Sequence, residues 1–209
     1  MKSSQIRVLA INGGTENSAH TTVLLRHVLR ELENSGIQTE LIELWGANLH
    51  DCRDCKECLL QKNRRCVQTD DMGNVLIEKM AQADGILFGS PASDAEIAPE
   101  MKALMDRACA VSKANDQMFR HKTGAAVVSM RRAGALRTFD TLNHFFLMNE
   151  MVVPGASFWN AGFAKDDCDG ELDAECIATM EVLAKNLAWL LNSTRSAEVI
   201  PDLEEILAP

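Results

Sequence analysis

Short apolar runs alternate with helical patterns along nearly the whole chain. The runs at 6–12, 85–89 and 124–130 are continuously apolar, 38–44 alternates, and "MVVPG" at 151–155 is a short fifth run. Each predicts a strand. Amphipathic stretches at 21–36, 70–84, 98–114, 137–150 and 171–193 predict the helices between and after them. Such strict alternation predicts an α/β protein with a parallel sheet covered on both faces.

Five parallel strands of this kind suit a doubly wound sheet in the flavodoxin-like order 2-1-3-4-5. A chain of 209 residues is long enough for one such core and short for two full-sized domains. We therefore expect a single domain over 1–192, with a cysteine-rich insertion at 51–66 after the second strand. Residues 193–209 are expected to form a C-terminal tail.

Charge and hydropathy exclude two classes of partner. A net charge of −9 and a pI near 5.0 disfavour nucleic acid, because binding to a phosphate backbone relies on a basic surface. No apolar run reaches the roughly 18 residues of a membrane span. The N-terminal residues "MKSSQIRVLAING" lack the cleavage region of a signal peptide. We expect a cytoplasmic protein.

In this strand order, a ligand should lie where the first and third strands end, because the topology switches direction there. The loops that follow them are "NGGTENSAHTT" (12–22) and "GSPASDAEI" (89–97). The first is small and polar and opens a helix, so its N–H groups can hold a phosphate. Hydroxyl donors there are Thr15, Ser18, Thr21 and Thr22. An ordinary capped turn would use the same residue types.

Four of the seven cysteines lie within "DCRDCKECLLQKNRRC", residues 51–66. Cys52, Cys55, Cys58 and Cys66 form the pattern C-x2-C-x2-C-x7-C. Thiolates spaced in this way suit an iron-sulfur cluster. Zinc is an alternative, although structural zinc more often uses two separated C-x2-C pairs, which this segment lacks. Metal-free thiols or an adventitious disulfide are a further alternative. Cys109 and Cys176 fall in helical patterns and are expected to be small core residues.

Several motifs, in the same order, resemble the NAD(P)H-dependent FMN reductase and iron-sulfur flavoprotein family. "INGGTENSAHTTVLL" resembles its phosphate loop, I-N-G-S-P-R-x-x-x-N-T-x-x-L. The stretch around "GSPASDAEIAPEMKALMDR" resembles the segment with its G-S-P turn, and "VVSMRRAGALRTFDTLNHFFLMNEMVVPGASFWNAG" its third flavin-facing loop. The resemblance extends to about residue 192 and implies a flavodoxin-like fold that binds FMN.

Carried over position by position, the resemblance implies three groups of cofactor-binding residues. Around the phosphate stand Gly13, Gly14, Thr15, Ser18, His20 and Thr21, with Thr21 as the main hydroxyl donor. Against the ribityl chain and ring stand Ser90, Pro91, Ala92 and Ser93, and around the pyrimidine end stand Ser129, Met130, Arg131, Arg132 and Gly134. The four motif cysteines would hold a 4Fe-4S cluster. The chain departs from the family pattern at Gly14, Glu16 and Ser93.

The implied function is an FMN-dependent oxidoreductase that accepts hydride from NAD(P)H. Electrons would pass to a quinone-like or flavin acceptor, or to a redox protein through the cluster. Because the cofactor carries the chemistry, no acid-base residue of the protein is required. Two alternatives are an electron carrier without a substrate of its own and a redox-sensing scaffold that has lost FMN. The resemblance also implies a homodimer or homotetramer.

Overall fold

A computed structural model describes residues 5–14, 19–130, 133–163 and 174–195. Its five strands form one parallel sheet in the order β2-β1-β3-β4-β5, which confirms the predicted fold class. The strands are β1 (Arg7–Asn12), β2 (Gln38–Glu43), β3 (Gly85–Pro91), β4 (Thr123–Met130) and β5 (Ala161–Phe163). In register, Asn12 lies beside Glu43 and Gly89, so these strands end at one edge of the sheet.

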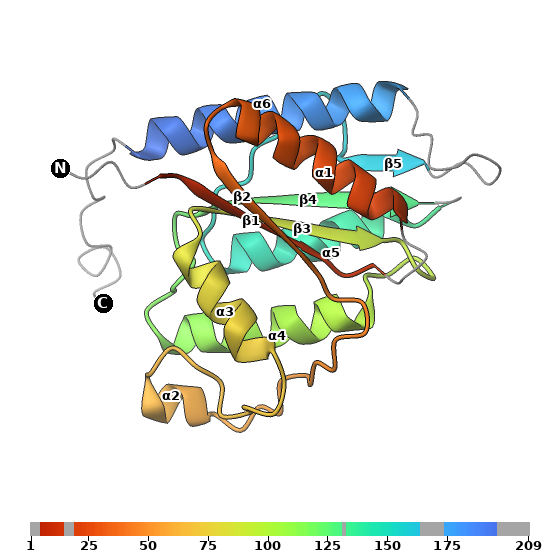
Figure 1. The fold of residues 1–209 in the computed structure, drawn as a ribbon. Coiled ribbons are helices and arrows are strands. Elements are labelled where there is room, and N and C mark those ends of the chain that lie inside the picture. Colours follow the sequence, from red (N-terminus) through yellow and green to blue (C-terminus); the bar gives the residue numbers. More distant parts are fainter. Residues whose placement is uncertain (1–4, 15–18, 131–132, 164–173, 196–209) are drawn as a thin grey trace, which may run out of the picture.

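Helices cover both faces of the sheet (Figure 1). One face carries α1 (Ala19–Asn34) and α6 (Ala174–Arg195), and the other carries α3 (Gly73–Gln82), α4 (Pro99–Ala114) and α5 (Ala135–Met148). The buried side chains accordingly form two clusters. One packs α3, α4 and α5 on the sheet around Phe88, Met101 and Phe146, and the other packs α1 and α6 around Leu25, Val127 and Leu187. No helix in the described part of the chain is both long and apolar enough to cross a membrane.

The fifth strand was predicted at the wrong place. Residues 151–155 make only an isolated bridge, between Val152 and Thr123, at the amino end of β4. Pro154 has no N–H to donate, so the segment cannot continue as a ladder. The chain instead reaches the carboxyl end of β4 with β5, where Val128 lies beside Ala161. Trp159 therefore precedes the last strand.

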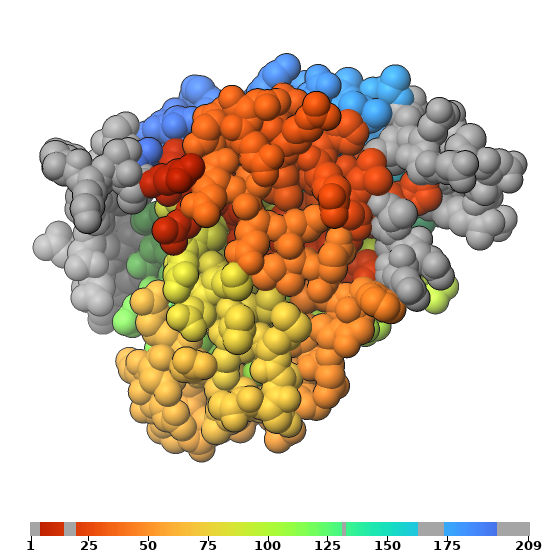
Figure 2. All heavy atoms as spheres, viewed as in Figure 1, coloured from red at the N-terminus to blue at the C-terminus, as the bar shows by residue number. Residues whose placement is uncertain are grey.

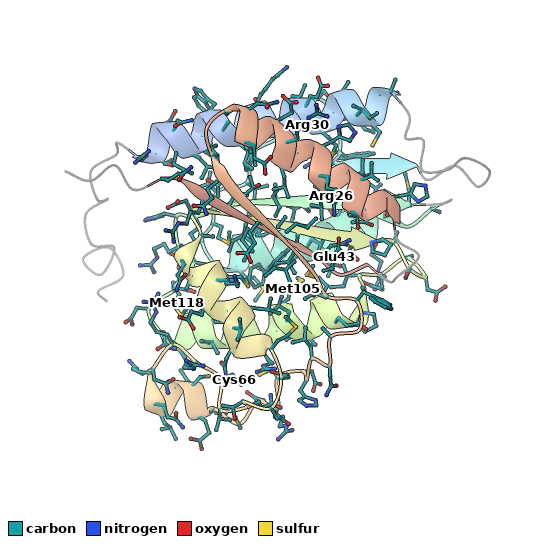
Figure 3. All side chains as sticks on the ribbon, viewed as in Figure 1. Arg26, Arg30, Glu43, Cys66, Met105 and Met118 are labelled. Carbon is teal, nitrogen blue, oxygen red and sulfur yellow. The ribbon has the colours of Figure 1, made fainter. Side chains whose placement is uncertain are left out.

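The cysteine segment lies outside the sheet layers. It follows β2, contains one short helix, α2 (Glu57–Gln61), and contacts α4 on the side away from the sheet. Figure 2 shows it as a lobe beneath the body of the molecule. In Figure 3, Cys66 lies in this lobe, and Met105 of α4 lies between the lobe and the sheet. The lobe and the carboxyl edge of the sheet are thus two separate places, both in contact with α4.

Candidate functional site

The loop after β1 is held by the side chain of Asn12, which is buried. Its Oδ1 accepts a hydrogen bond from the Gly14 N–H (2.9 Å), and its Nδ2 donates to Thr22 Oγ1 (3.0 Å) and to Glu43 Oε2 (2.7 Å). Thr22 in turn donates to the other Glu43 oxygen (3.0 Å). Figure 3 labels Glu43 at the end of β2. The Thr22 hydroxyl, a predicted phosphate donor, is therefore directed to a carboxylate of the protein.

Gly13 brings this loop against the loop after β3. Its N–H donates to the Gly89 carbonyl (2.8 Å). A Cβ at Gly13 would lie 2.7 Å from Met101 Cβ on α4. That distance is shorter than side chains tolerate, so the backbone passes directly over the first turn of α4. Glycine is needed here for close approach.

Thr21 and Ser129 meet although they are 108 residues apart in sequence. Both side chains are buried, and their hydroxyl oxygens lie 2.7 Å apart. One hydroxyl hydrogen forms this bond, so the pair retains one further O–H donor. The bond joins the first turn of α1 to the end of β4. Two residues expected on opposite ends of the cofactor therefore stand in direct contact.

Thr21→Val is expected to lower the free energy of unfolding by about 1 to 2 kcal/mol, because it leaves the buried Ser129 hydroxyl without its partner. Adding Ser129→Ala in the same chain should recover part of that loss, since no polar group is then left unpaired. Urea unfolding of the two single variants and the double variant measures the coupling. Strictly additive losses would show that the two hydroxyls do not interact.

His20, at the start of α1, is half-buried. Its Nε2 is inaccessible to solvent and has no hydrogen-bond partner among the described residues. A buried ring nitrogen without a partner is uncommon and calls for an explanation. Its place beside the predicted phosphate loop fits an anion that accepts from this nitrogen.

The loop after β3 begins with a buried serine and a tight turn. Ser90 Oγ accepts from the Ala98 N–H (3.0 Å) and donates to the Pro91 carbonyl (2.9 Å), so it fixes the entry to α4. Ser93 and Glu96 then exchange two backbone hydrogen bonds of 3.1 and 2.9 Å. The two residues between them both have positive φ, 48° and 63°. These are the dihedral signs of a type I′ turn.

This turn packs against the loop after β4. The Ala92 N–H donates to the Ser129 carbonyl (2.8 Å). Gly134, with φ +93°, comes so close that a Cβ there would lie 2.6 Å from Ala95 Cα. Arg137 and Glu96 form an ion pair across the same junction. The second and third predicted loops therefore form one surface at the carboxyl edge of the sheet.

Most of the predicted cofactor residues are thus brought together. The ends of β1, β3 and β4, the loops after them and the first turn of α1 contain Gly13, Gly14, His20, Thr21, Ser90, Pro91, Ala92, Ser93, Ser129, Met130 and Gly134. Thr15, Ser18, Arg131 and Arg132 lie outside the described residues. Beside this edge is a largely apolar cavity of about 430 Å³, lined by Met130, Gly134, the ring pair Phe158 and Trp159, and Glu175.

The four motif cysteines line a second cavity, of about 220 Å³, between the lobe and α4. Cys52, Cys58 and Cys66 are half-buried, and Cys55 is exposed. The Cys58 thiol donates to the Ala110 carbonyl of α4 (3.8 Å), and burial raises its pKa, with Cys52 and Cys55 adding to the increase. Among the described residues, no two cysteines are joined by a disulfide. No disulfide therefore stabilises the described part of the cysteine segment.

The described thiols of this segment form no site for a single metal ion. Within the described ranges, no three His, Cys, Asp or Glu side chains come close enough to bind a single metal ion. Structural zinc needs four ligands at about 2.0 to 2.3 Å. The described residues show no metal site for an iron-sulfur cluster either, so the cluster stays a prediction. Of the two other cysteines that were expected in the core, Cys176 is buried and Cys109 is half-buried.

Polar side chains that sequence reasoning missed hold the lobe in place. Asn74 accepts from the Cys66 N–H (2.7 Å) and donates to the Cys66 and Gln68 carbonyls (both 2.9 Å). Gln68 donates to the Asp51 carbonyl (2.9 Å), which joins the two ends of the segment. Asn and Gln after a cysteine motif are unremarkable in a sequence, so no local signal could have identified them.

Asp71 is the acidic residue of this network. It accepts from the His50 N–H (2.9 Å) and the Gly73 N–H (2.9 Å), and it pairs with Arg107 of α4. Burial alone would raise the pKa of Asp71, but the hydrogen bonds from His50, Arg107 and Gly73 outweigh burial and hold the pKa below its ordinary value. The carboxylate is therefore ionised throughout the neutral range.

Asp71→Asn should lower the free energy of unfolding at pH 7 by about 3 kcal/mol, because it leaves the buried Arg107 without its counter-ion. The folded pKa is the lower one, so this contribution is present above the unfolded pKa of about 3.9 and is lost as the pH falls through the folded value. The difference between variant and wild type should therefore shrink below about pH 4. Urea unfolding at pH 7, 5 and 3 measures it. A difference that stays constant across this range would contradict the argument.

The sheet order defines a doubly wound, flavodoxin-like fold. Comparison with solved structures agrees: RosB, crystallised with 8-demethyl-8-formylriboflavin-5′-phosphate, superposes with a TM-score of 0.72 over 96% of this chain and 84% of its own, at 15% identity. Within that class, residues 6–166 match the NADPH-dependent FMN reductase family. The chain belongs to this family of flavin-dependent oxidoreductases.

Two relatives are similar over almost their whole lengths. An iron-sulfur flavoprotein of Methanocaldococcus jannaschii is 32% identical over 190 residues, which cover 88% of this chain and 96% of the relative. An iron-sulfur flavoprotein of Archaeoglobus fulgidus is 29% identical over 192 residues, with 88% and 96% covered. The similarity therefore includes the cysteine lobe as well as the sheet.

Proposed function

We propose that the protein is an FMN-dependent oxidoreductase with a 4Fe-4S cluster on Cys52, Cys55, Cys58 and Cys66. It would transfer electrons between NAD(P)H or a protein donor and a quinone, flavin or iron-sulfur acceptor. The observation that carries the proposal is that the four thiols line one cavity beside α4, whose first turn packs under Gly13 at the other site. FMN, when bound, would accept a hydride, and the cluster would transfer single electrons. A homo-oligomer is part of the proposal.

The residues at the edge of the sheet fit FMN. The N–H groups around Gly14 and the amino end of α1 would hold the phosphate, and the unpartnered His20 Nε2 would donate to it. Ser90 to Ser93 would lie along the ribityl chain and ring. Met130 to Gly134 would lie along the pyrimidine edge, where N–H donors stabilise the charge that a flavin gains on reduction.

Two features work against tight phosphate binding. Glu43 stands beside the loop and takes up the Thr22 hydroxyl, and Gly14 replaces a serine of the family pattern. Glu43 takes a hydroxyl donor of this loop and adds a negative charge near a dianion, and Gly14 lacks the serine hydroxyl that the family pattern would supply. FMN affinity below that of a serine-containing loop is the expected consequence.

Protein purified without oxygen tests the proposal. We expect flavin absorption bands, a broad shoulder that dithionite bleaches, and about four irons and four labile sulfides per chain. Oxidation of NADH or NADPH without any added reductase supports an enzyme. Flavin without nicotinamide oxidation would favour an electron carrier, and a colourless protein that ignores added FMN would favour a redox-sensing scaffold.

A further inference from the structure

One buried arginine holds both ends of the cysteine segment. Arg107 of α4 is 1% exposed. Its Nη1 donates to the His50 carbonyl (3.3 Å) and pairs with Asp71, and its Nη2 donates to the Gln68 carbonyl (3.1 Å). His50 precedes the first cysteine and Gln68 follows the last. A single guanidinium therefore closes the lobe against α4.

The start of α3 leaves space for this guanidinium. A Cβ at Gly73 would lie 2.5 Å from Arg107 Cζ and Nη1, so any side chain there would displace the guanidinium. The planar fork with five N–H donors can serve acceptors on two chain segments at once, whereas a lysine ammonium acts as a point charge. Arginine is thus matched to its place by geometry as well as by charge.

Arg107 and Gln68 also line the cavity of the four cysteines. Arg107 Nε and Gln68 Oε1 are both buried and have no hydrogen-bond partner in the part of the chain that the structure describes. Gln68 Nε2 lies 3.9 Å from Cys66 Sγ. Buried polar atoms without partners are rare in folded proteins and indicate a missing ligand or water. Here the N–H without a partner belongs to a side chain that lines the thiol cavity.

We propose that Arg107 is the positioning residue of the four-cysteine site. It holds Cys52 to Cys66 in a geometry ready for the cluster before the cluster is assembled, and its Nε–H donates to the bound cluster. This inference rests on the proposed function. Outer partners that orient metal ligands affect metal affinity by about 10- to 100-fold, so the contribution of Arg107 should be large.

The test compares Arg107→Lys with Arg120→Lys. Arg120 pairs with Glu150, does not line the cavity of the four cysteines, and is the matched control. Hydrogen exchange of the metal-free proteins reports on residues 51–68 without any cluster. Iron and sulfide after anaerobic reconstitution report on assembly, and the midpoint potential reports on the Nε–H donor. FMN content shows that each variant is folded, and Arg107→Met with Asp71→Asn is a second variant that leaves no unpaired buried charge.

We expect Arg107→Lys to exchange at least about tenfold faster over 51–68, to retain FMN, and to hold less than about a third of the wild-type iron. The clusters that do assemble should have a more negative potential, because hydrogen bonds to a cluster raise its potential. A purely structural role would leave that potential unchanged. Wild-type exchange and wild-type iron in Arg107→Lys would overturn the inference.

Failure of the proposed function gives a different result. If wild-type protein takes up no iron, the cluster assignment fails. Faster exchange over 51–68 in Arg107→Lys, with Arg120→Lys unchanged, would still support Arg107 as the residue that positions the thiols. Unchanged exchange in that case would overturn both.

Discussion

Replacement of Cys58 by alanine is expected to remove the iron-sulfur cluster and leave FMN bound. Iron should fall from about four to below about one per chain, because a cubane cluster that loses one of four thiolates is no longer held in its cavity. Cys58 is central among the four: it is half-buried, lies on α2, and its thiol reaches the backbone of α4 at Ala110. Anaerobic iron and sulfide assays, with flavin absorbance on the same sample, measure the effect.

Cys109→Ala is the matched control. Cys109 lies on α4 beside Ala110, is half-buried like Cys58, and does not line the thiol cavity. It should retain full iron. Equal iron in Cys58→Ala and wild type would mean that the four cysteines do not form the cluster site. Loss of FMN together with iron would mean that the variant is misfolded, and it would then say nothing specific about the thiols.

Gly134→Ala should weaken FMN binding by at least about tenfold and lower the free energy of unfolding by about 2 to 4 kcal/mol. Two costs add at this position. The φ of +93° strains any residue with a Cβ, and that Cβ would lie 2.6 Å from the backbone of Ala95 in the neighbouring loop. To relieve the contact, the second and third loops must separate, which spoils the surface proposed for the flavin. Fluorescence titration with FMN and urea unfolding measure the two effects.

Gly36→Ala separates the two costs. Gly36 has a comparable φ of +78°, but a Cβ there would meet none of the described residues within 4 Å, and the residue lies between α1 and the amino end of β2. It should lose about 1 to 2 kcal/mol from backbone strain alone and bind FMN as wild type does. If Gly134→Ala also binds FMN like wild type, the junction of the two loops is not part of the flavin site.

The strands and helices of the body could be predicted because each has a local pattern. The runs at 6–12, 38–44, 85–89 and 124–130 lie within one or two residues of β1 to β4 as observed. The prediction of the fifth strand was wrong because it also relied on a local pattern. The three residues of β5, "AGF", have no such pattern, whereas "MVVPG" is apolar. A strand so short is selected by its neighbour β4 and not by its own residues.

Some features of the two candidate sites could be predicted from the sequence and others could not. The polar loops after β1, β3 and β4 and the spacing of the four cysteines are visible in the sequence. Asn12, Glu43, Asp71 and Arg107 were missed, because each is an ordinary polar residue whose role appears only with its partner. Arg107 lies in an amphipathic helical pattern, and an arginine there would ordinarily be expected at the surface.

The sequence alone determined the order of strands and helices, the flavodoxin-like class and the chemical types present at each loop. Those properties depend on periodicity and on neighbours within a few residues. Only the tertiary structure decided that Thr21 bonds to Ser129 across 108 residues, and that Arg107 closes the cysteine lobe through partners 36 to 57 residues away. Contacts at such separations form when α1, α4 and the lobe pack on the sheet, and no local pattern encodes them.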